Sequence, residues 1–304
     1  MKNAKKGFIS TIQFYSTKDG PGIRSTVFTV GCNLRCVWCA NPELMFPDEK
    51  YMYYKQKCIK CGACAEISEG KVILREDGCE IDRKASPDWM KLAEVCPQSA
   101  YEIKGEYWTS EELVQKLLRD KDFYIVSGGG VTFSGGEAAL QAEFVGEASE
   151  LLRSHGIHTA LDTAGNIRWE QMGPLADKVD LLLYDIKAMD AGLHKKCTGA
   201  DNSLILENAR RIAKTGKQMW IRMVIVPGWN DDISDIRERF RFVRSLGPAV
   251  ERVDVLKYHS LGVSKYRQMG IGYGVAPGTK CSEALMDSIR RTADEEGVRI
   301  HVDN

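Results

Sequence analysis

Three cysteines stand close together near the N-terminus, in the segment GCNLRCVWCANPE of residues 31–43. Cys32, Cys36 and Cys39 are separated by three and then by two residues. A closed structural zinc site normally has four ligands, and its cysteines tend to come in pairs. Three thiolates on one loop suit a 4Fe–4S cubane whose fourth iron stays open to another ligand. By spacing alone, a zinc site and an iron–sulfur cluster are both open.

A second group of cysteines follows the pattern of a ferredoxin. A two-cluster ferredoxin repeats C-x₂-C-x₂-C-x₃-C-P, and the fourth cysteine of each run binds the other cluster. Cys58, Cys61 and Cys64 begin the first run, and Cys96 followed by Pro97 ends the second. The remaining positions lack a thiol: Ser68, Ser86, Trp89 and Leu92. The pattern therefore predicts one auxiliary 4Fe–4S cluster bound by Cys58, Cys61, Cys64 and Cys96.

Three further cysteines do not fit this pattern. Cys79 lies in REDGCEID, which we expect to be a turn between two short strands, and it is the competing fourth ligand. A zinc site built from the same four cysteines is the alternative, but the Cys96–Pro97 pair favours iron–sulfur. Cys197 and Cys281 are isolated and are expected to be ordinary thiols.

The elements that must position these groups follow a regular order. Short apolar runs alternate with helical stretches, which favours a parallel sheet that is covered on both faces. Six runs are expected to be strands: 25–32, 131–137, 158–165, 181–189, 220–228 and 253–262. Helices are expected at 110–120, with Ser110 as N-cap, and at 203–216, with Gly216 as C-cap. Six such units predict an α/β fold, a partial (β/α)6 barrel of the TIM type.

Polar side chains follow the ends of these strands, which is where a β/α barrel carries its chemistry. They are Glu137, Asp162, Asp185, Lys187, Arg222 and His259. Any one of them could cap a loop, and a lone histidine is more often a hydrogen-bonded core residue. Six such residues at one rim indicate a site.

One segment interrupts this order. Residues 51–104 break the first crossover and carry Cys58, Cys61, Cys64, Cys79 and Cys96. About 50 residues make a thin core, so bound metal would help this segment to fold. We therefore expect a barrel of residues 1–50 and 105–304, and an inserted ferredoxin-like α+β domain of residues 51–104.

The bulk composition excludes several classes of protein. The 304-residue chain has a formal net charge of zero, whereas nucleic-acid binders usually carry a basic surface. No run approaches the roughly 18 apolar residues of a membrane span, and no signal-peptide core follows the basic N-terminus. Ten cysteines without a secretory signal fit a reducing compartment. We therefore expect a cytoplasmic protein that binds neither nucleic acid nor membrane.

Several motifs resemble those of one known family. CNLRCVWC resembles the three-cysteine signature of the radical S-adenosylmethionine (SAM) superfamily, and FSGGEA resembles its glycine–glycine–glutamate motif. Further segments are similar to the activating enzymes of glycyl radical enzymes, of the pyruvate formate-lyase activase type. They run from residue 19 to residue 266 and are DGPGIR, CANPE, LDTAG, DIKAMD, RMVIVPGWND and YHSLGVSKY.

This resemblance implies a reaction, its cofactors and its partners. An iron–sulfur cluster gives one electron to SAM, and the resulting 5′-deoxyadenosyl radical takes a hydrogen atom from a backbone glycine of a glycyl radical enzyme. The resemblance implies the SAM-site 4Fe–4S cluster, SAM and a monovalent cation; with the auxiliary cluster that the ferredoxin spacing predicts, two 4Fe–4S clusters are expected. Flavodoxin or ferredoxin is the expected electron donor, and the activase is expected to be a monomer. Relatives with this insert often carry two auxiliary clusters, so the missing cysteines depart from their pattern.

The resemblance also implies roles for single positions. Cys32, Cys36 and Cys39 would bind the SAM-site cluster, and Asp162 and Asp185 would lie near the cation. The implied contacts with SAM are Trp38, Ser134, Gly135, Gly136, Glu137, Asp162, Lys187 and His259. The residues implied to lie near the glycine loop of the partner are Asp19, Arg24 and Arg222.

Two other functions are alternatives. A radical SAM enzyme that acts on a small molecule would share the cysteines and SGGEA, but not obviously DGPGIR or YHSLG. A ferredoxin-like electron carrier with an attached barrel is a different class of protein. The three-cysteine loop and the polar rim argue against an electron carrier.

Overall fold

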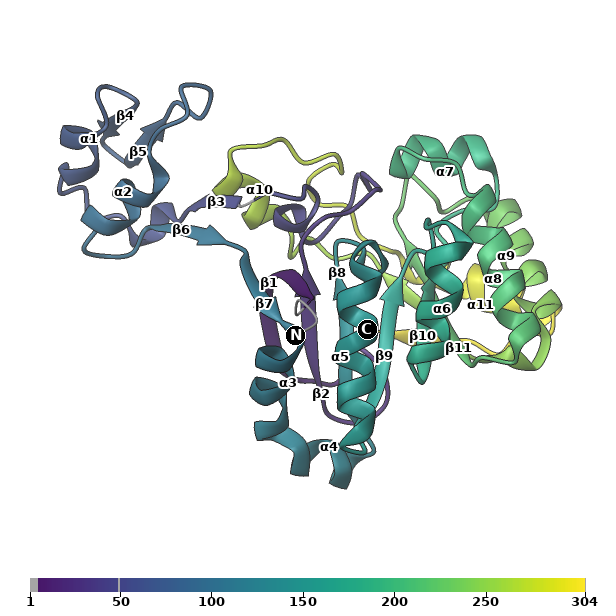
Figure 1. The fold of residues 1–304 in the computed structure, drawn as a ribbon. Coiled ribbons are helices and arrows are strands. Elements are labelled where there is room, and N and C mark those ends of the chain that lie inside the picture. Colours follow the sequence, from purple (N-terminus) through teal and green to yellow (C-terminus); the bar gives the residue numbers. More distant parts are fainter. Residues whose placement is uncertain (1–4, 49, 304) are drawn as a thin grey trace.

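The computed structural model describes residues 5–48 and 50–303, and an open curved sheet dominates it (Figure 1). Within these residues the sheet has nine strands, in the order β13-β12-β11-β10-β9-β8-β2-β1-β7. Their bounds are β1 (Lys6–Ser16), β2 (Arg24–Thr29), β7 (Glu106–Thr109), β8 (Gly130–Gly135), β9 (His158–Thr163), β10 (Leu181–Asp185), β11 (Met219–Ile225), β12 (Val250–Lys257) and β13 (His301–Asp303). Neighbours from β2 to β13 are parallel, whereas β1 is antiparallel to both β2 and β7. The predicted α/β fold with a mostly parallel sheet is confirmed.

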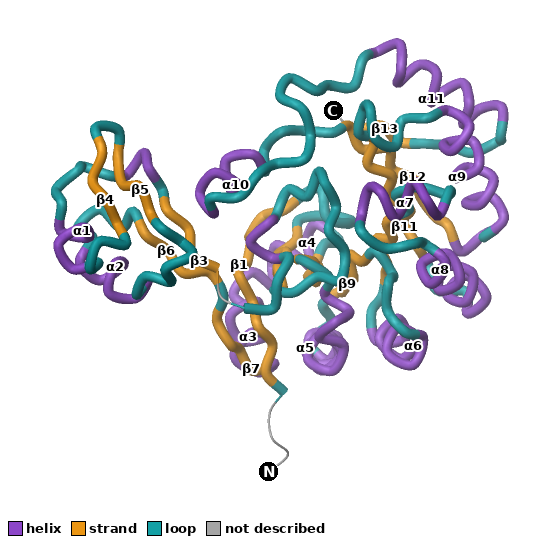
Figure 2. Tube along the Cα trace, turned by 90° about the horizontal axis from the view of Figure 1, so that it is seen from above, coloured by secondary structure: helices purple, strands orange, loops and turns teal. Residues whose placement is uncertain are grey.

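Helices connect the strands, and the view from above shows α5, α6 and α8 along the outer side of the curved sheet (Figure 2). The α-helices of this part are α3 (Ser110–Leu117), α4 (Lys121–Ser127), α5 (Ala142–Ser154), α6 (Trp169–Lys178), α7 (Ala191–Thr198), α8 (Ser203–Thr215), α9 (Ile233–Ser245), α10 (Val263–Met269) and α11 (Glu283–Glu295). Short 3-10 turns are η1 (Pro42–Leu44), η2 (Lys55–Lys57), η3 (Leu118–Asp120), η4 (Ala138–Gln141) and η5 (Gly247–Ala249). Among the described residues, no helix is long and apolar enough to cross a membrane.

The two sides of the sheet have different chemistry because successive side chains of a strand point to opposite faces. In β8, Val131 and Phe133 are fully buried in the main hydrophobic core with the helices. Thr132 and Ser134 alternate with them, and both make hydrogen bonds to polar side chains of neighbouring segments. The inner face of β8 is therefore polar, whereas β9, β10 and β11 place Ala160, Leu183 and Trp220 in a separate small apolar cluster.

The six expected strands form as β2 and β8 to β12, with boundaries shifted by a few residues. The expected C-cap of α8 is confirmed, because Gly216 has a left-handed backbone conformation with φ +79°. The expected N-cap of the helix at 110–120 is wrong by one residue. Thr109 caps α3 and exchanges hydrogen bonds with Glu112 in a capping box, so Ser110 is the first helical residue.

A small lobe interrupts the barrel after the first cysteine loop (Figure 1). The antiparallel strands β3 (Lys50–Tyr53) and β6 (Tyr101–Lys104) form a ribbon that leads to it. The lobe contains α1 (Ala63–Ile67), the hairpin of β4 (Val72–Arg75) and β5 (Gly78–Ile81), and α2 (Trp89–Val95). Its own small core includes Val72, Trp89 and Leu92. Cys79 lies within β5 and not in the turn where we expected it.

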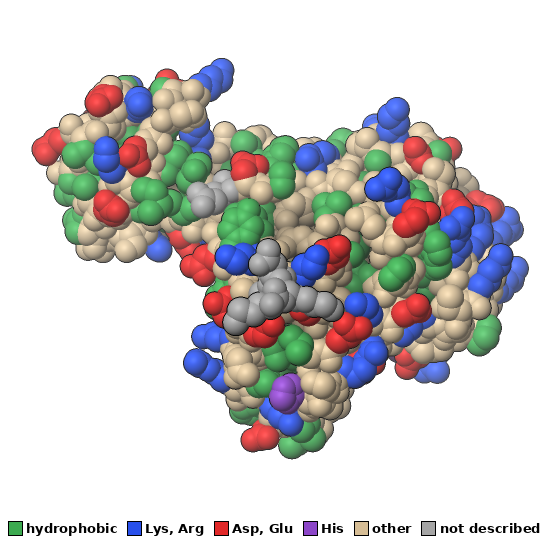
Figure 3. Space-filling view, viewed as in Figure 1, with side chains coloured by type: hydrophobic (Ala, Val, Ile, Leu, Met, Phe, Trp, Pro, Cys, Tyr) green, Lys and Arg blue, Asp and Glu red, His purple; other side chains and the backbone are tan. Residues whose placement is uncertain are grey.

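Charged side chains are distributed over the face of the molecule that Figure 3 shows. Lysine and arginine side chains alternate there with aspartate and glutamate, and no broad area of one sign is visible. This mixture agrees with the formal net charge of zero.

Candidate active site

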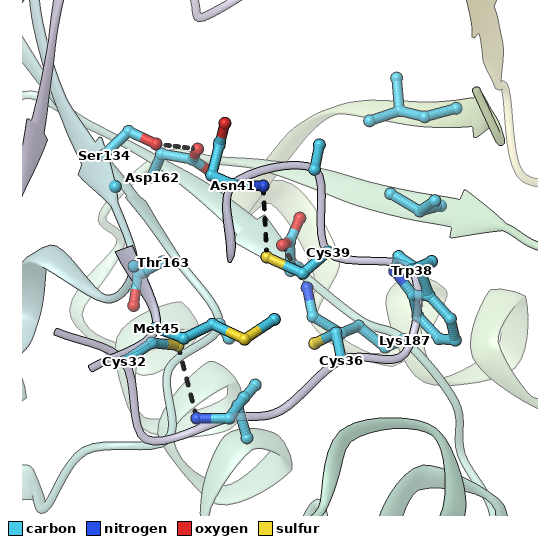
Figure 4. Close-up of a pocket in the computed structure, with 18 of the residues that line it drawn as sticks. Cys32, Cys36, Trp38, Cys39, Asn41, Met45, Ser134, Asp162, Thr163 and Lys187 are labelled. Atoms are coloured by element: carbon cyan, nitrogen blue, oxygen red, sulfur yellow. Dashed lines mark hydrogen bonds and ion pairs between the residues drawn. The ribbon is translucent and has the colours of Figure 1, made fainter. Parts of the chain in front are cut away.

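A cavity lies at the carboxyl ends of the parallel strands, where the loop of the first three cysteines folds over the sheet (Figure 4). It brings together residues from segments that are far apart in the sequence. The expected site residues that line it are Cys32, Cys36, Trp38, Cys39, Ser134, Gly135, Gly136, Asp162, Asp185, Lys187 and His259. Four other expected residues, Glu137, Arg222, Asp19 and Arg24, do not line it and are described separately below.

The three cysteines surround one side of this cavity (Figure 4). The backbone N–H of Leu34 donates to Cys32 Sγ at 3.4 Å, and the N–H of Asn41 donates to Cys39 Sγ at 3.4 Å. Burial raises the pKa of Cys32 to about 11, of Cys36 to about 12 and of Cys39 to about 11. Half-buried thiols at one cavity, two of them with an N–H group directed at the sulfur, suit a bound metal, which stabilises the thiolate form.

The carboxyl end of α7 holds the cysteine loop in place. The N–H of Arg35 donates to Thr198 O at 2.7 Å, and the N–H of Val37 donates to Cys197 O at 3.0 Å. These carbonyls belong to the last turn of the helix, where they have no intrahelical partner. The loop therefore supplies hydrogen-bond donors to the free carbonyl groups at the end of α7, and these bonds fix the loop between Cys32 and Cys39.

Gly135 and Gly136 are required by the protein's own backbone. Gly135 has φ +132°, and a Cβ atom there would lie 2.3 Å from the carbonyl oxygen of Thr29. A Cβ atom on Gly136 would lie 2.2 Å from Gly31 O and 2.5 Å from Leu44 O. The glycine pair thus lets the end of β8 pass directly under the cysteine loop, in addition to lining the cavity.

Glu137 has a different position from the one we expected. Its side chain is buried behind the cavity wall and accepts hydrogen bonds from Thr163 Oγ1 at 2.6 Å, Ala164 N at 2.9 Å and Ala139 N at 3.1 Å. Burial raises the pKa of Glu137 to about 7. The carboxylate ties the end of β8 to the end of β9 and does not line the cavity, and its expected contact with the SAM ammonium stays a prediction.

Asp162 is the centre of a polar group on the other side of the cavity. Ser134 Oγ donates to Asp162 Oδ2 at 2.7 Å, and Arg222 Nη1 lies 3.2 Å from Asp162 Oδ1 (Figure 4 shows the first pair). Burial raises the pKa of Asp162, and the Arg222 guanidinium acts in the opposite direction. Arg222 therefore reaches the site through Asp162 and not by lining the cavity.

Lys187 supplies a positive charge inside the cavity. It forms an ion pair with Asp185, and its side chain is nearly buried. Burial lowers the pKa of Lys187, but Asp185 and Cys36 outweigh this effect and raise it above its ordinary value. The side chain is thus a buried ammonium beside the three thiols. His259 lies exposed at the rim, while Trp38 is buried and packs in one cluster with Tyr258.

Comparisons with known proteins agree with this arrangement. The family model described as the radical SAM superfamily matches residues 94–240. The (2S)-3-sulfopropanediol dehydratase activating enzyme of Klebsiella oxytoca is 35% identical over 280 residues, which are 90% of this chain and 88% of that protein. The choline trimethylamine-lyase activating enzyme of Oleidesulfovibrio alaskensis is 35% identical over 94% of each chain. The chain belongs to the activating enzymes of glycyl radical enzymes.

Solved structures support the fold of this activating enzyme. A radical SAM methyltransferase from Sphaerobacter thermophilus has a TM-score of 0.54 and 14% identity, over 97% of this chain and 76% of that chain. At this identity the likeness concerns the fold alone. Membership of the family implies a 4Fe–4S cluster, SAM and a glycyl radical enzyme as partner. The three thiols, the buried ammonium and the glycine pair fit these cofactors.

Two residues expected near the partner's glycine differ in position. Arg24 lies at the amino end of β2. Asp19 lies beside the middle of β2 and β8, where its charge acts on Asp162 and Arg222. Arg24, the first residue of β2, is fully buried and donates to Thr132 Oγ1 at 2.7 Å, Val131 O at 2.7 Å and Pro21 O at 3.0 Å. Its guanidinium therefore holds the activating enzyme's own segments together, which corrects its expected contact with the partner. Asp19 accepts a hydrogen bond from Thr26 Oγ1 at 2.8 Å.

The lobe contains a second cysteine cavity. Five cysteines line it: Cys58, Cys61, Cys64, Cys79 and Cys96. Cys79 Sγ lies 3.5 Å from Cys64 Sγ and 4.0 Å from Cys58 Sγ, so the strand that carries Cys79 places it with the expected ligands. The N–H of Ala100 donates to Cys96 Sγ at 3.3 Å, the same kind of contact that the first loop makes.

Some cavity residues were not among the expected ones. Asn41, Met45, Thr163 and Tyr258 all line the cavity (the first three are labelled in Figure 4). Asn41, Thr163 and Tyr258 belong to the motifs CANPE, LDTAG and YHSLGVSKY, so those motifs contained the signal. Met45 is the second residue after CANPE, and only the fold places it at the site.

Proposed function

We propose that Cys32, Cys36 and Cys39 bind the SAM-site 4Fe–4S cluster, and that the cavity beside them binds SAM for activation of a glycyl radical enzyme. The observation that carries this proposal is the convergence of three half-buried thiols and the Lys187 ammonium on one cavity. When bound, the cluster supplies the electron that cleaves SAM and produces a 5′-deoxyadenosyl radical. This chain's residues bind the cofactors, orient them and exclude water.

We propose further roles from the charges in the cavity. Lys187 suits the carboxylate of SAM, because a buried ammonium makes strong charge-assisted hydrogen bonds. Asp162, oriented by Ser134, suits the ribose hydroxyls or a monovalent cation shared with Asp185. His259 at the rim and the backbone around Gly135 and Gly136 complete the contacts. Glu137 acts in this proposal by holding the loop that follows β9.

We also propose that the lobe is a ferredoxin-like domain with one auxiliary 4Fe–4S cluster on Cys58, Cys61, Cys64 and Cys96. Packing at the positions without thiols supports a single cluster. Three of these positions are filled by protein contacts: Ser68 accepts a hydrogen bond from Val72 N at 3.0 Å, and Trp89 and Leu92 belong to the lobe core. Cys79 is the alternative fourth ligand, because its sulfur contacts that of Cys64.

One experiment tests the proposed function directly. The reconstituted and reduced protein is incubated with SAM and with a candidate glycyl radical enzyme encoded beside its gene. We expect a glycyl radical signal in electron paramagnetic resonance (EPR) and stoichiometric 5′-deoxyadenosine. Flavodoxin or ferredoxin is the proposed physiological donor and should replace the chemical reductant. Formation of 5′-deoxyadenosine without a protein radical for any such candidate would instead favour a small-molecule substrate.

A further inference from the structure

The short helix α10 lies between the two cysteine-bearing parts of the molecule. Figures 1 and 2 both place it beside β3, at the base of the lobe, and it also contacts η1 after the first cysteine loop. No residue of α10 lines the cavity or has a role in the proposed function. Its side chains and backbone nevertheless make polar contacts with both parts.

Toward the cavity, Lys265 of α10 holds the end of the cysteine loop. Its Nζ donates to Asn41 Oδ1 at 2.6 Å and forms an ion pair with Glu43. Asn41 is the residue whose N–H donates to Cys39 Sγ. Gly262, just before the helix, packs so closely that a Cβ atom there would lie 2.7 Å from Ala40 Cα. The start of α10 thus lies directly on the segment that follows Cys39.

The ion pair with Lys265 is partly buried on the carboxylate side. The Glu43 side chain is 8% exposed, and its second oxygen, Oε2, has no hydrogen-bond partner among the described residues. A buried carboxylate is strongly destabilising when its partner is removed. Lys265 therefore stabilises the structure, because it neutralises the buried charge of Glu43 at the end of the loop that carries the cysteines.

Toward the lobe, Arg83 holds the other end of α10. Its Nη2 donates to Gln268 O at 2.6 Å, and its Nη1 donates to Tyr51 O of β3 at 2.9 Å. The same guanidinium lies 4.8 Å from the centre of the Trp89 ring, which stacks on Tyr51. One side chain thus joins the helix, the ribbon and the lobe core. The planar guanidinium suits this combination of forked donation and stacking.

We propose that α10 is a brace that positions the SAM-site cysteine loop relative to the auxiliary lobe, with Lys265 and Arg83 as its two positioning residues. This inference rests on the proposed function for the identity of the two clusters. The contacts themselves are properties of the protein chain. The brace therefore has a readout that does not depend on any bound cofactor, namely the hydrogen–deuterium exchange of the backbone amides that it protects.

The first test replaces Lys265 by methionine, which keeps the length of the side chain and removes its charge. In Lys265→Met we expect faster amide exchange in peptides covering 31–45, with no change in β9 to β11. Lys265→Arg should restore slow exchange, and Lys214→Met, at an exposed lysine of α8, is the matched control. Glu43→Gln removes the ion pair from the carboxylate side. In this variant, too, we expect faster amide exchange in residues 31–45. Unchanged exchange of residues 31–45 in both Lys265→Met and Glu43→Gln would overturn the brace.

The second test uses the iron-loaded protein and Arg83→Met. Pulsed EPR of the fully reduced protein measures the distance distribution between two paramagnetic clusters. We expect a single narrow distribution in the wild type and a broadened one in Arg83→Met, with faster amide exchange in 50–54 and 101–104. An unchanged distribution together with unchanged exchange would refute the role of Arg83. A wild-type protein that binds no auxiliary iron would contradict the proposed auxiliary cluster. The hydrogen–deuterium exchange measurements on the variants would still show whether α10 acts as a brace.

The two tests also separate positioning from simple loss of stability. Removal of the Lys265 charge leaves a net negative charge near the SAM-site cluster, which makes its reduction harder. The midpoint potential of that cluster should therefore become more negative in Lys265→Met and less so in the double variant with Glu43→Gln. The auxiliary cluster should keep its potential in Lys265→Met and in the double variant, because this third measurement reports only the charge close to the SAM-site cluster. Equal potentials of the SAM-site cluster in wild type and Lys265→Met would count against close coupling of α10 to the loop.

Discussion

At the scale of single residues, the proposed chemistry depends on three thiols whose positions are fixed by backbone contacts. Cys36 is the middle ligand, so Cys36→Ala removes one of three anchors of the proposed SAM-site cluster. We expect reductive cleavage of SAM to be abolished, measured as 5′-deoxyadenosine by chromatography. Cys281→Ala, at an isolated and partly buried thiol, is the control and should retain cleavage. Cleavage at the wild-type rate in Cys36→Ala would remove this cysteine from the ligand set.

Glu137 gives a second residue-scale prediction, because its carboxylate satisfies buried donors of two loops. In Glu137→Ala the N–H of Ala164 loses its acceptor, which typically costs about 1–3 kcal/mol for one buried unsatisfied donor. We expect the free energy of unfolding to fall by about 1–3 kcal/mol or more, measured by urea denaturation of the apoprotein. If the stability is unchanged and only the affinity for SAM falls, Glu137 contacts the cofactor directly.

Which residues would gather at the site could be predicted from motifs at the ends of strands. Where each side chain points could not, because that depends on neighbours from other segments. Glu137 has the expected place in the sequence, but Thr163 and Ala164 draw its carboxylate behind the wall. Arg24 lies in the expected motif, but the carbonyl groups of Pro21 and Val131 bury its guanidinium.

At the scale of elements, continuous apolar runs identified the buried parallel strands. The edge strands β7 and β13 and the antiparallel strand β1 were missed, because they lie outside the regular alternation of parallel strands and helices. The position of Cys79 beside the other cysteines also could not be predicted from the spacing of cysteines in the sequence. A hairpin brings β5 back over α1, and only this pairing puts Cys79 beside Cys64.

The ligand set of the auxiliary site is the prediction that belongs to this scale. One auxiliary cubane and one SAM-site cubane give about eight irons per chain. We expect Cys96→Ala to lower the iron content toward about four, because a cubane normally needs its four thiolates. Cys79→Ala should leave it unchanged, as measured by iron and sulfide analysis after reconstitution.

Two outcomes of that measurement would change the assignment. If Cys79→Ala loses the iron and Cys96→Ala keeps it, then the hairpin cysteine is the fourth ligand and the ferredoxin spacing does not apply here. A wild-type content of about twelve irons would indicate a third cluster. Ser68, Trp89 and Leu92 would then have to rearrange, since all three are now used for packing or hydrogen bonds within the lobe.

At the scale of the whole molecule, the lobe and the barrel differ in how much core supports them. The barrel core extends through the strands and the surrounding helices, whereas the lobe core is a small group around Tyr53, Trp89 and Tyr101. Apolar burial is the main stabilising contribution to folding, so we expect the lobe to depend more on its proposed cluster than the barrel does on the SAM-site cluster. The ribbon of β3 and β6 and the helix α10 join the two parts.

This difference predicts the effect of iron removal on the intact protein. A chelator that strips both clusters should destabilise the lobe far more than the barrel, because metal binding contributes folding free energy to a domain with a thin core. We expect limited proteolysis of the stripped protein to cut first within 54–100 and to leave the barrel segments resistant, as identified by mass spectrometry. Calorimetry should show an early transition that is absent from the iron-loaded protein. If cleavage instead begins in the barrel, or both forms unfold in one transition at the same temperature, the lobe is stable without its cluster and the cluster's role there is electronic rather than structural.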